Sequence, residues 1–385
     1  MKVALVHDYI KEYGGAERVL ETLHEIWPDA PVFTTVYLPE FLGPHQARFR
    51  NLNIKTSFLQ YLPFKAKLIS PIRLIAPFVF KTFDFSQFDA VIVSATGAYS
   101  PNLLNTKYKI HNTIHVCYCH TPPRYLYGYA TAREWKKNLV SKILGEIANH
   151  FLRLIDFKSA QNVDYFIANS KNVSQRISKF YRRNSTVIYP PIDTNSMKYE
   201  VLSIEHKKNT KYSILNTQYY LTGGRIAKPK HIDLIIETFT KLKLPLIVFG
   251  RSFAGHDSQF MIHDSNVKFV GEVSDEEKLK LMKNAKAFVF ASEDEDFGIT
   301  PVEAMSTGTP VIAYKSGGVV ESVLQGRTGI FFDALTIDGL SKAIKQFNNL
   351  TIDPKECIKQ AEKFGKERFK KEIQLFVESA YKKNL

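Results

Sequence analysis

Short apolar segments alternate with segments of helical periodicity along the whole chain. In the first half they cover residues 3–6, 90–93, 114–117, 165–168 and 186–189, and in the second half residues 219–222, 245–248, 267–270, 287–290 and 310–313. Apolar runs of this length between helical patterns are typical of the buried strands of a parallel sheet. The pattern therefore predicts two α/β units in tandem.

A polar, lysine-rich stretch, residues 195–212, separates the two series and is the predicted interdomain linker. The chain has 385 residues, which is about twice the length of a typical domain. We therefore expect an N-terminal domain, residues 1–197, and a C-terminal domain, residues 198–362, followed by a basic helical segment, residues 363–385. Ligands of such sheets bind at the carboxyl ends of the strands, which places the expected site in a cleft between the domains.

A glycine pair, Gly14 and Gly15, follows the first apolar run, and apolar residues then recur at helical spacing. The pair is predicted to open a helix, whose N-terminal amides suit a phosphate group. The third glycine of the dinucleotide-binding fingerprint is missing. An ordinary tight turn explains the pair equally well.

Two cations follow the first apolar run of the second half, Arg225 after Gly223-Gly224 and Lys230 five residues later. The planar guanidinium of arginine and the compact ammonium of lysine are the two kinds of cation that hold a diphosphate. The alternative is a solvated basic turn, because most exposed charges have no binding role.

An acidic run, residues 293–296, is followed by Phe297, Gly298 and Ile299 and then by a predicted helix start. Thr300 fits an N-cap, Pro301 the first helical position and Glu303 a capping-box glutamate. Capping alone does not explain Phe297-Gly298-Ile299, whose amides are placed to face a ligand. The neighbouring carboxylates suit the hydroxyl groups of a sugar.

A histidine and cysteine cluster begins at residue 115. In a strand His115, Cys117 and Cys119 point to one face, but no second pair stands at zinc spacing, so we expect no metal site. His120 follows at the strand end with Arg124 nearby, where loops face the expected cleft. A packed or solvated histidine is the alternative.

The net charge of +14 implies an anionic partner, and no nucleic-acid-binding motif is present. Three cysteines indicate a reducing compartment, and neither a signal peptide nor an apolar run of roughly 18 residues is found, so a cytoplasmic protein is expected. Residues 41–83 contain no Asp or Glu but interleave seven Lys and Arg with apolar side chains. This segment is predicted to contact an anionic membrane surface, unless its apolar residues pack in a core.

With these motifs the chain resembles glycosyltransferase family 4, a retaining group that includes bacterial mannosyltransferases. Two glutamates separated by seven residues, Glu295 and Glu303, carry the resemblance together with residues 119–124 and 189–193. The similarity extends over nearly the whole chain. It implies the α/β GT-B fold: two Rossmann-like domains with an interdomain cleft, and a C-terminal helix, residues 363–385, that crosses back to the N-terminal domain.

The resemblance also implies roles for individual residues. Glu295 would contact the transferred sugar and Glu303 the ribose, while Arg225 and Lys230 would carry the diphosphate. His120 and Arg124 would touch the donor sugar or the acceptor, and His120 would act in catalysis together with Glu295, Arg225 and Lys230. The remaining donor-binding positions would be Gly14, Gly15, Val273, Phe297, Gly298, Ile299 and Thr300.

The implied reaction is hexose transfer with retention, in which the leaving diphosphate takes the acceptor proton and no metal or cofactor is required. The resemblance favours GDP-mannose as donor, with a UDP-sugar second, and a lipid-linked or other glycan acceptor at the inner face of the plasma membrane. A soluble acceptor and a nucleotide-sugar epimerase of the same fold remain alternatives. One departure from the family pattern is Gly250-Arg251-Ser252 in place of a Gly-Asp-Gly type turn. The oligomeric state stays open.

Overall fold

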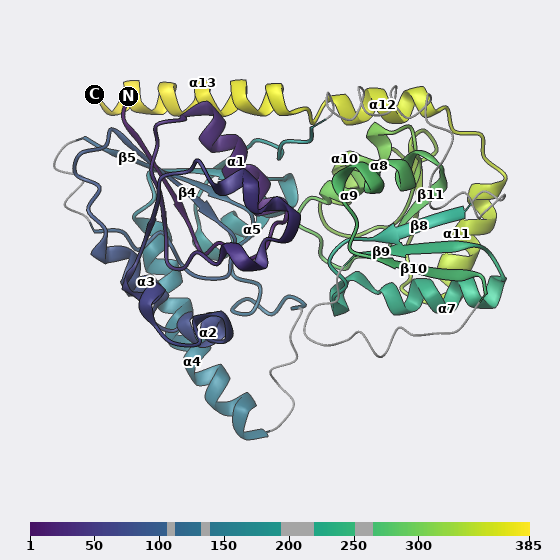
Figure 1. Cartoon of the computed structure of the whole chain (residues 1–385), viewed down its shortest axis with the longest axis horizontal. Helices are drawn as coiled ribbons and strands as arrows, with labels where there is room; N and C mark the ends of the chain where they lie inside the picture. Colours follow the sequence, from purple (N-terminus) through teal and green to yellow (C-terminus); the bar gives the residue numbers. More distant parts are fainter. Residues whose placement is uncertain (106–111, 132–138, 194–218, 251–264) are drawn as a thin grey trace. The chain divides into compact units, whose positions relative to one another are not determined.

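The computed structural model describes residues 1–105, 112–131, 139–193, 219–250 and 265–385. The chain forms two compact units (Figure 1). Unit 1 contains Met1–Tyr129, the described residues from 139 to Pro191, and Glu367–Leu385. Unit 2 contains Ala130, Thr131 and the described residues of Ile192–Lys366. The predicted linker, residues 195–212, and Arg251 and Ser252 lie outside the described residues.

Among the described residues, unit 1 contains a seven-stranded parallel sheet of order β3-β2-β1-β4-β5-β6-β7. The order reverses between β1 and β4, as in doubly wound nucleotide-binding sheets. The central strands are buried on both faces, which explains their continuous apolar runs. The strands are β1 Val3–His7, β2 Val32–Thr34, β3 Ile54–Thr56, β4 Ala90–Ala95, β5 Ile114–Cys119, β6 Tyr165–Ala168 and β7 Ser185–Val187.

Unit 2 repeats this topology, with a six-stranded parallel sheet of order β10-β9-β8-β11-β12-β13 in the part of the chain that is described. Its order reverses between β8 and β11. The predicted strands of both halves are confirmed, whereas the short β2 and β3 and the edge strand β13 were not predicted. The strands are β8 Tyr219–Gly223, β9 Leu246–Phe249, β10 Val267–Gly271, β11 Ala285–Phe290, β12 Val311–Tyr314 and β13 Gly329–Phe332.

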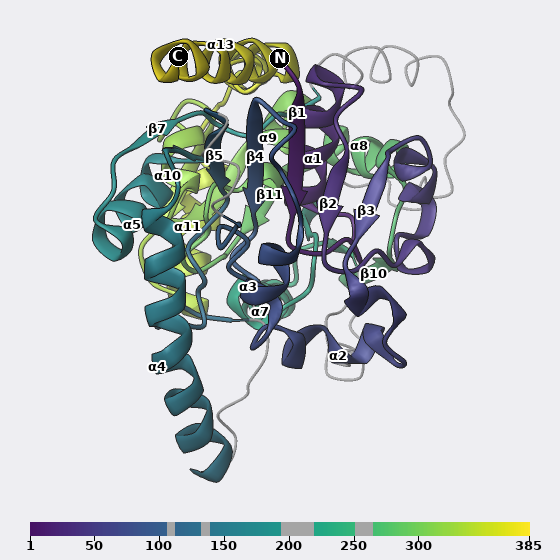
Figure 2. The same cartoon turned by 90° about the vertical axis from the view of Figure 1, so that its left-hand side faces the viewer.

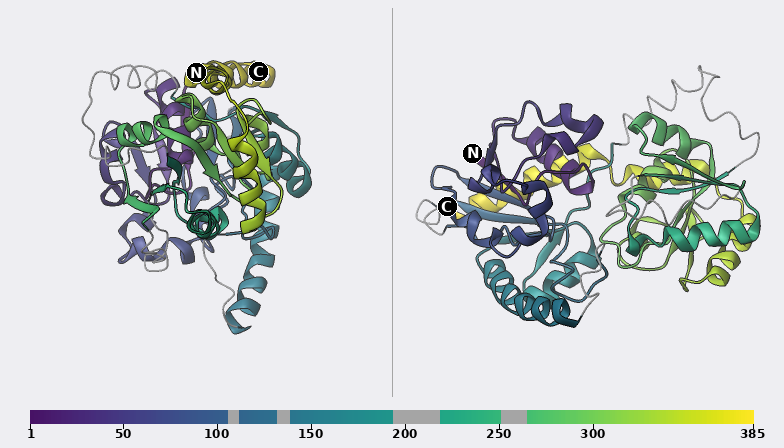
Figure 3. Two further views of the ribbon diagram at one scale, coloured as in Figure 1. Left: turned by 90° about the vertical axis from the view of Figure 1, so that its right-hand side faces the viewer. Right: turned by 60° about the horizontal axis from the view of Figure 1, so that its bottom comes forward.

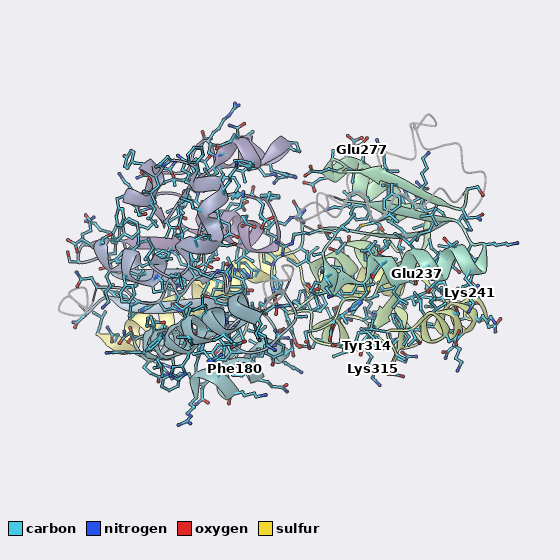
Figure 4. The ribbon with its side chains drawn as sticks, turned by 90° about the horizontal axis from the view of Figure 1, so that it is seen from below. Phe180, Glu237, Lys241, Glu277, Tyr314 and Lys315 are labelled. Carbon is cyan, nitrogen blue, oxygen red and sulfur yellow. The ribbon has the colours of Figure 1, made fainter. Side chains whose placement is uncertain are left out.

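Helices flank both sheets (Figures 1 and 2). In unit 1 they are α1 Gly15–Ile26, η1 Pro39–Phe41, η2 Gly43–Phe49, η3 Phe58–Tyr61, α2 Lys65–Ile72, α3 Ala76–Val79, η4 Phe80–Thr82, α4 Leu139–Gln161 and α5 Lys171–Tyr181. In unit 2 they are η6 Lys228–Lys230, α7 Ile232–Leu242, α8 Asp275–Lys283, α9 Ile299–Ser306, α10 Val319–Ser322, α11 Ile337–Asn348 and α12 Pro354–Glu362. Helix α7 shows the usual amphipathic arrangement: Glu237 and Lys241, one turn apart, are exposed (Figure 4), while Ile235 and Ile236 are buried.

The last helix, α13 (Lys366–Asn384), packs on unit 1. Phe369, Ile373 and Val377 are buried in the same hydrophobic cluster as β1 and β5. At the surface, Lys370 Nζ lies 2.7 Å from Glu25 Oε2. The predicted return of the C-terminal helix to the N-terminal domain is confirmed, although a break at residues 363–365 separates α12 from α13.

Candidate active site

The glycine loop of unit 1 opens a helix, as predicted: α1 begins at Gly15 with Gly14 as its N-cap. The Gly14 amide donates a hydrogen bond to Glu17 Oε2 at 2.9 Å. A buried carboxylate therefore already satisfies this end of the helix, where the dipole favours negative charge. Glu17 was not identified from the sequence, although its position three residues after Gly14 is the capping-box spacing.

Glu17 is linked to a buried polar chain at the carboxyl ends of β1, β4 and β5. His7 Nε2 lies 3.6 Å from Glu17 Oε1, and His7 Nδ1 lies 3.2 Å from Ser94 Oγ. The same hydroxyl lies 2.9 Å from His120 Nε2. Burial, assisted by His7, lowers the pKa of His120 to about 3, so its imidazole is neutral at physiological pH. The predicted His120 thus forms a chain with His7 and Ser94, which were not predicted.

A buried carboxyl, Asp8, follows β1 directly. Its Oδ2 accepts a hydrogen bond from the Thr96 amide at 2.9 Å and another from the Thr96 hydroxyl. Burial raises the pKa of Asp8 to about 6, although His7 and the hydrogen bonds from Thr96 act in the opposite direction. This carboxyl changes protonation close to physiological pH, which an exposed aspartate does not.

The loop after β5 holds Arg124, which is half-buried. The loop packs tightly against Gly97, where φ is +78° and an added Cβ would lie 2.7 Å from the Thr121 carbonyl oxygen. Arg176 Nη1 donates to Thr121 Oγ1 at 3.2 Å from the opposite side. Contacts distant in sequence therefore position the loop of His120 and Arg124.

The cysteines of β5 pack within the protein. Asn102 contacts both His115 Nε2, at 3.1 Å, and Cys117 Sγ, at 3.4 Å, while Cys117 and Cys119 belong to the hydrophobic core. Across the described ranges, no group of three His, Cys, Asp or Glu side chains is arranged to hold a metal ion.

In unit 2, the loop after β8 meets the loop after β11. Lys230 Nζ lies 2.6 Å from Glu295 Oε2, and Ser292 Oγ donates to the same carboxylate oxygen at 2.6 Å. Lys230 also lies over the Phe290 ring, 4.8 Å from its centroid. The Lys230 side chain is 25% exposed and paired with a carboxylate, which differs from the fully solvated basic turn of the alternative.

The start of α9 differs from the prediction. The helix begins at Ile299 and its N-cap is Gly298, whose left-handed φ of +89° brings the chain into the helix two residues early. Thr300 and Pro301 are therefore the second and third helical residues, and Glu303 does not form a capping box. No side chain caps this end, so the first amides of α9, including those of Ile299 and Thr300, face outward from the helix start.

Glu303 makes a long-range contact instead. Its Oε1 lies 2.9 Å from Lys278 Nζ on α8, and both side chains are buried. Lys278 Nζ also lies 3.2 Å from Asp275 Oδ1. Lys278 was not predicted, although the capping box of Ser274 and Glu277 that begins α8 can be recognised in the sequence. Glu277 is labelled in Figure 4.

The loop of Glu295 lies directly on a glycine pair before α10. The Gly318 amide donates to the Glu295 carbonyl at 2.7 Å. At Gly317, with φ +69°, an added Cβ would lie 2.2 Å from the same oxygen. These glycines were not predicted, and only residues without a side chain permit this approach.

The remaining predicted residues surround this loop. Phe297 is buried with its ring centroid 5.2 Å from that of Phe364. The space beside Gly224 is free of close contacts: the atom nearest to an added Cβ would be Thr300 Oγ1, in the first turn of α9, at 3.9 Å. The adjacent Arg225 is exposed, and Val273 is half-buried in the loop between β10 and α8.

Two doubly wound units, each with polar side chains at the carboxyl ends of strands beside the point where the order reverses, form the GT-B fold. The chain matches the Glycosyltransferase Family 4 domain over residues 13–196 and the glycosyl transferases group 1 domain over residues 204–364. The two matches together span most of the chain. The protein belongs to glycosyltransferase family 4 and is a hexosyltransferase.

Curated relatives agree with this assignment, and a solved structure agrees with the fold. The alpha-1,3/1,6-mannosyltransferase ALG2 of Dictyostelium discoideum is 23% identical over 320 residues, covering 73% of this chain and 71% of that protein. The capsular polysaccharide biosynthesis glycosyltransferase CapM of Staphylococcus aureus is 26% identical over 198 residues, covering 48% of this chain and 52% of that protein. Anabaena Alr3699/HepE, solved with UDP and glucose, is similar in fold with a TM-score of 0.71 at 17% identity, covering 98% of this chain and all of that one.

Proposed function

We propose that the protein transfers a hexose, with retention of configuration, from a nucleotide diphosphate sugar to a lipid-linked or other glycan acceptor at the inner face of the plasma membrane. Mannose from GDP-mannose is the first choice of donor and a UDP-sugar the second. The names of the ALG2 relatives support mannose, and the UDP and glucose bound to Alr3699/HepE support the second choice.

The contact between Lys230 and Glu295 carries this proposal. In a sugar nucleotide, the sugar is joined directly to the terminal phosphate, so groups that recognise the two must stand side by side. Lys230, the predicted diphosphate ligand, lies 2.6 Å from Glu295, the predicted sugar ligand. The outward-facing amides of α9 begin four residues after Glu295 and add donors suited to a phosphate.

The proposed reaction follows from these positions. The acceptor hydroxyl oxygen forms a bond to the anomeric carbon as the bond from that carbon to the diphosphate oxygen breaks. The acceptor proton passes to the departing diphosphate on the same face of the sugar. Lys230 and Arg225 stabilise the negative charge that develops on the leaving group, which is the contribution expected to be largest in such a site. In this scheme no metal ion is required.

Incubation of the purified protein with a panel of nucleotide sugars, with and without a polyprenyl-linked glycan acceptor, tests the proposal. We expect nucleoside diphosphate release that depends on the acceptor, is fastest with GDP-mannose, and persists in excess chelator. The coupling constants of the anomeric proton in the product report retention or inversion. An altered sugar nucleotide formed without acceptor supports the epimerase alternative, and transfer to a free oligosaccharide alone supports a soluble acceptor.

A further inference from the structure

Helix α4 presents apolar side chains to solvent. Six of them are each more than half exposed, up to 71% for Leu139. They follow one another at helical spacing and form a stripe along one side of the helix. The six are Leu139, Ile143, Leu144, Ile147, Phe151 and Leu154.

The face of α4 that meets the rest of unit 1 combines buried Leu152 and Ala160 with several polar side chains. Asn149 Nδ2 donates to the Tyr125 carbonyl at 3.4 Å, and Arg153 Nη1 donates to the Leu126 carbonyl at 3.0 Å. Asp156 accepts hydrogen bonds from Ser100 Oγ at 2.7 Å and from Tyr127 Oη at 2.9 Å. An ordinary surface helix buries most of its apolar side chains, whereas α4 leaves a long apolar stripe exposed to water.

The N-terminal half of α4 extends away from the rest of unit 1, as three views show (Figures 1, 2 and 3). The inward contacts come from its second half, Asn149 onward. At 1.5 Å per residue, the stripe from Leu139 to Leu154 is about 22 Å long. No helix in the described part of the chain is long and apolar enough to span a bilayer.

A second exposed apolar element lies at the same end of unit 1, opposite α13 (Figures 1 and 2). In the η3–α2 turn, the exposed fraction is 57% for Phe58, 86% for Tyr61 and 76% for Phe64. Phe64 has a left-handed backbone with φ +57°. Such a conformation is unfavourable for a bulky residue, and here it does not bury the ring.

The structure divides the predicted membrane segment, residues 41–83, into two parts. The expectation that its apolar residues pack in a core is correct for one set: Leu59, Ile69, Ile72, Val79 and Phe80. The other set is at least one-third exposed: Phe41, Phe58, Tyr61, Leu62, Phe64, Leu74, Ile75 and Phe78. Only the second set is available to a membrane.

The charged residues near this surface indicate which partner it binds. Residues 41–83 carry seven Lys and Arg and no Asp or Glu. Of these, Lys67 is exposed on α2, whereas Arg48 pairs with Glu21 Oε1 at 3.1 Å and Arg73 lies over the Tyr125 ring. On α4, Lys142 and Lys158 are exposed, while Glu146 lies 3.9 Å from Arg153. Aromatic and aliphatic side chains beside cations match the interface of an anionic bilayer, where apolar groups enter the headgroup region and cations meet lipid phosphates.

We propose that the α4 stripe and the η3–α2 turn together form a membrane-docking surface that inserts into the headgroup region of an anionic bilayer. The biological purpose of this surface, delivery of the enzyme to a lipid-linked acceptor, rests on the function proposed above. The test of membrane binding does not depend on that function, because vesicle binding is measured without donor or acceptor.

The first experiment compares two variants of the surface with a matched control. The triple variant Ile143→Ser/Ile147→Ser/Phe151→Ser and the single variant Phe64→Ser remove exposed apolar groups, and Leu375→Ser removes one that is 56% exposed on α13. Flotation uses vesicles of phosphatidylcholine with and without phosphatidylglycerol. We expect the triple variant to lose at least tenfold in partition to anionic vesicles, Phe64→Ser to lose less, and Leu375→Ser to bind normally. High salt should weaken all binding.

The second experiment places a reporter in the surface. Quenching by brominated lipid should be greater for Phe64→Trp and Ile147→Trp than for wild type, and unchanged for Leu375→Trp. Equal partition to neutral vesicles, or normal binding of the triple variant, overturns the proposal. A different result also overturns it: the wild type sediments as a dimer and does not bind vesicles, and the triple variant is a monomer. The surface would then join two copies of the chain. Vesicle binding by a protein without transferase activity would contradict the proposed function alone.

Discussion

Replacement of Glu303 by glutamine tests whether its buried ion pair stabilises unit 2. Removing one partner of a buried pair costs about 3–5 kcal/mol when the other charge is left uncompensated. Here Lys278 keeps Asp275 Oδ1 at 3.2 Å, and the glutamine oxygen still accepts a hydrogen bond from the ammonium. We therefore expect Glu303→Gln to lower the free energy of unfolding by about 1–3 kcal/mol. A capping-box role would have predicted almost no change, since glutamine serves equally well there.

Calorimetry and donor titration measure the two consequences of this substitution. For a unit of this size the Tm should fall by about 2–10 °C, and hydrogen exchange should accelerate in α8 and α9. If Glu303 also holds the ribose, donor affinity falls. Glu293→Gln is the matched control, because it removes the same charge from a side chain that is 44% exposed and should change stability by less than about 0.5 kcal/mol.

A second substitution separates stability from binding. Lys278→Met in the Glu303→Gln background removes the buried ammonium that has lost one of its two carboxylate partners, so it should restore part of the lost stability without restoring donor affinity. An unchanged Tm in Glu303→Gln would refute the reasoning. Full recovery of binding in the double variant would show that Glu303 acts on the donor only through the fold.

Four further predictions concern the rest of the site. Lys230→Ala and Arg225→Ala should each lower kcat about 100-fold, with wild-type activity intact in excess chelator; near-normal turnover of either variant, or loss of activity on chelation, would contradict the proposed leaving-group stabilisation. Gly317→Ala and Gly326→Ala both place a side chain at a residue with left-handed backbone, but only Gly317→Ala also puts a Cβ 2.2 Å from the Glu295 carbonyl oxygen. Calorimetry should therefore show that Gly326→Ala lowers the free energy of unfolding by about 1 kcal/mol and that Gly317→Ala lowers it clearly more. Burial lowers the pKa of His120 from 6.5 to about 3, so between these pH values the unfolded chain binds a proton that the folded protein does not. In urea titrations between pH 5 and 8, the free energy of unfolding should therefore fall as the pH drops below 6.5, and His120→Gln should remove that loss. Asp8, with its pKa raised from 3.8 to about 6, acts with the opposite sign, so Asp8→Asn should stabilise the protein more at pH 8 than at pH 5.

The architecture was predictable because the buried strands are long apolar runs. β4 and β5 are buried at every position and stand out in the sequence. β2 and β3 have three residues each, and β3 is partly exposed, so neither has a periodic pattern long enough to recognise.

The site was predictable where chemistry follows directly on a strand, and not where a partner is distant. Gly14, Lys230 and Glu295 come from loops that a local motif marks. Lys278 and Gly317 act through contacts with residues 25 and 22 positions away, which no local pattern reveals. The helix start at Thr300 was wrong because the local capping pattern competes with the left-handed turn at Gly298, and the turn prevails.

The return of α13 to unit 1 has a consequence for the order in which the chain folds during synthesis. Apart from the short segment Ala130–Glu134, unit 2 is one continuous stretch, Ile192–Lys366, which is complete in sequence before the rest of α13 is made. Unit 1 begins first, but until α13 arrives its cluster around β1 and β5 lacks Phe369, Ile373 and Val377. The nascent N-terminal half therefore carries an uncovered apolar face throughout the synthesis of the second half, and that face is where a chaperone is expected to bind.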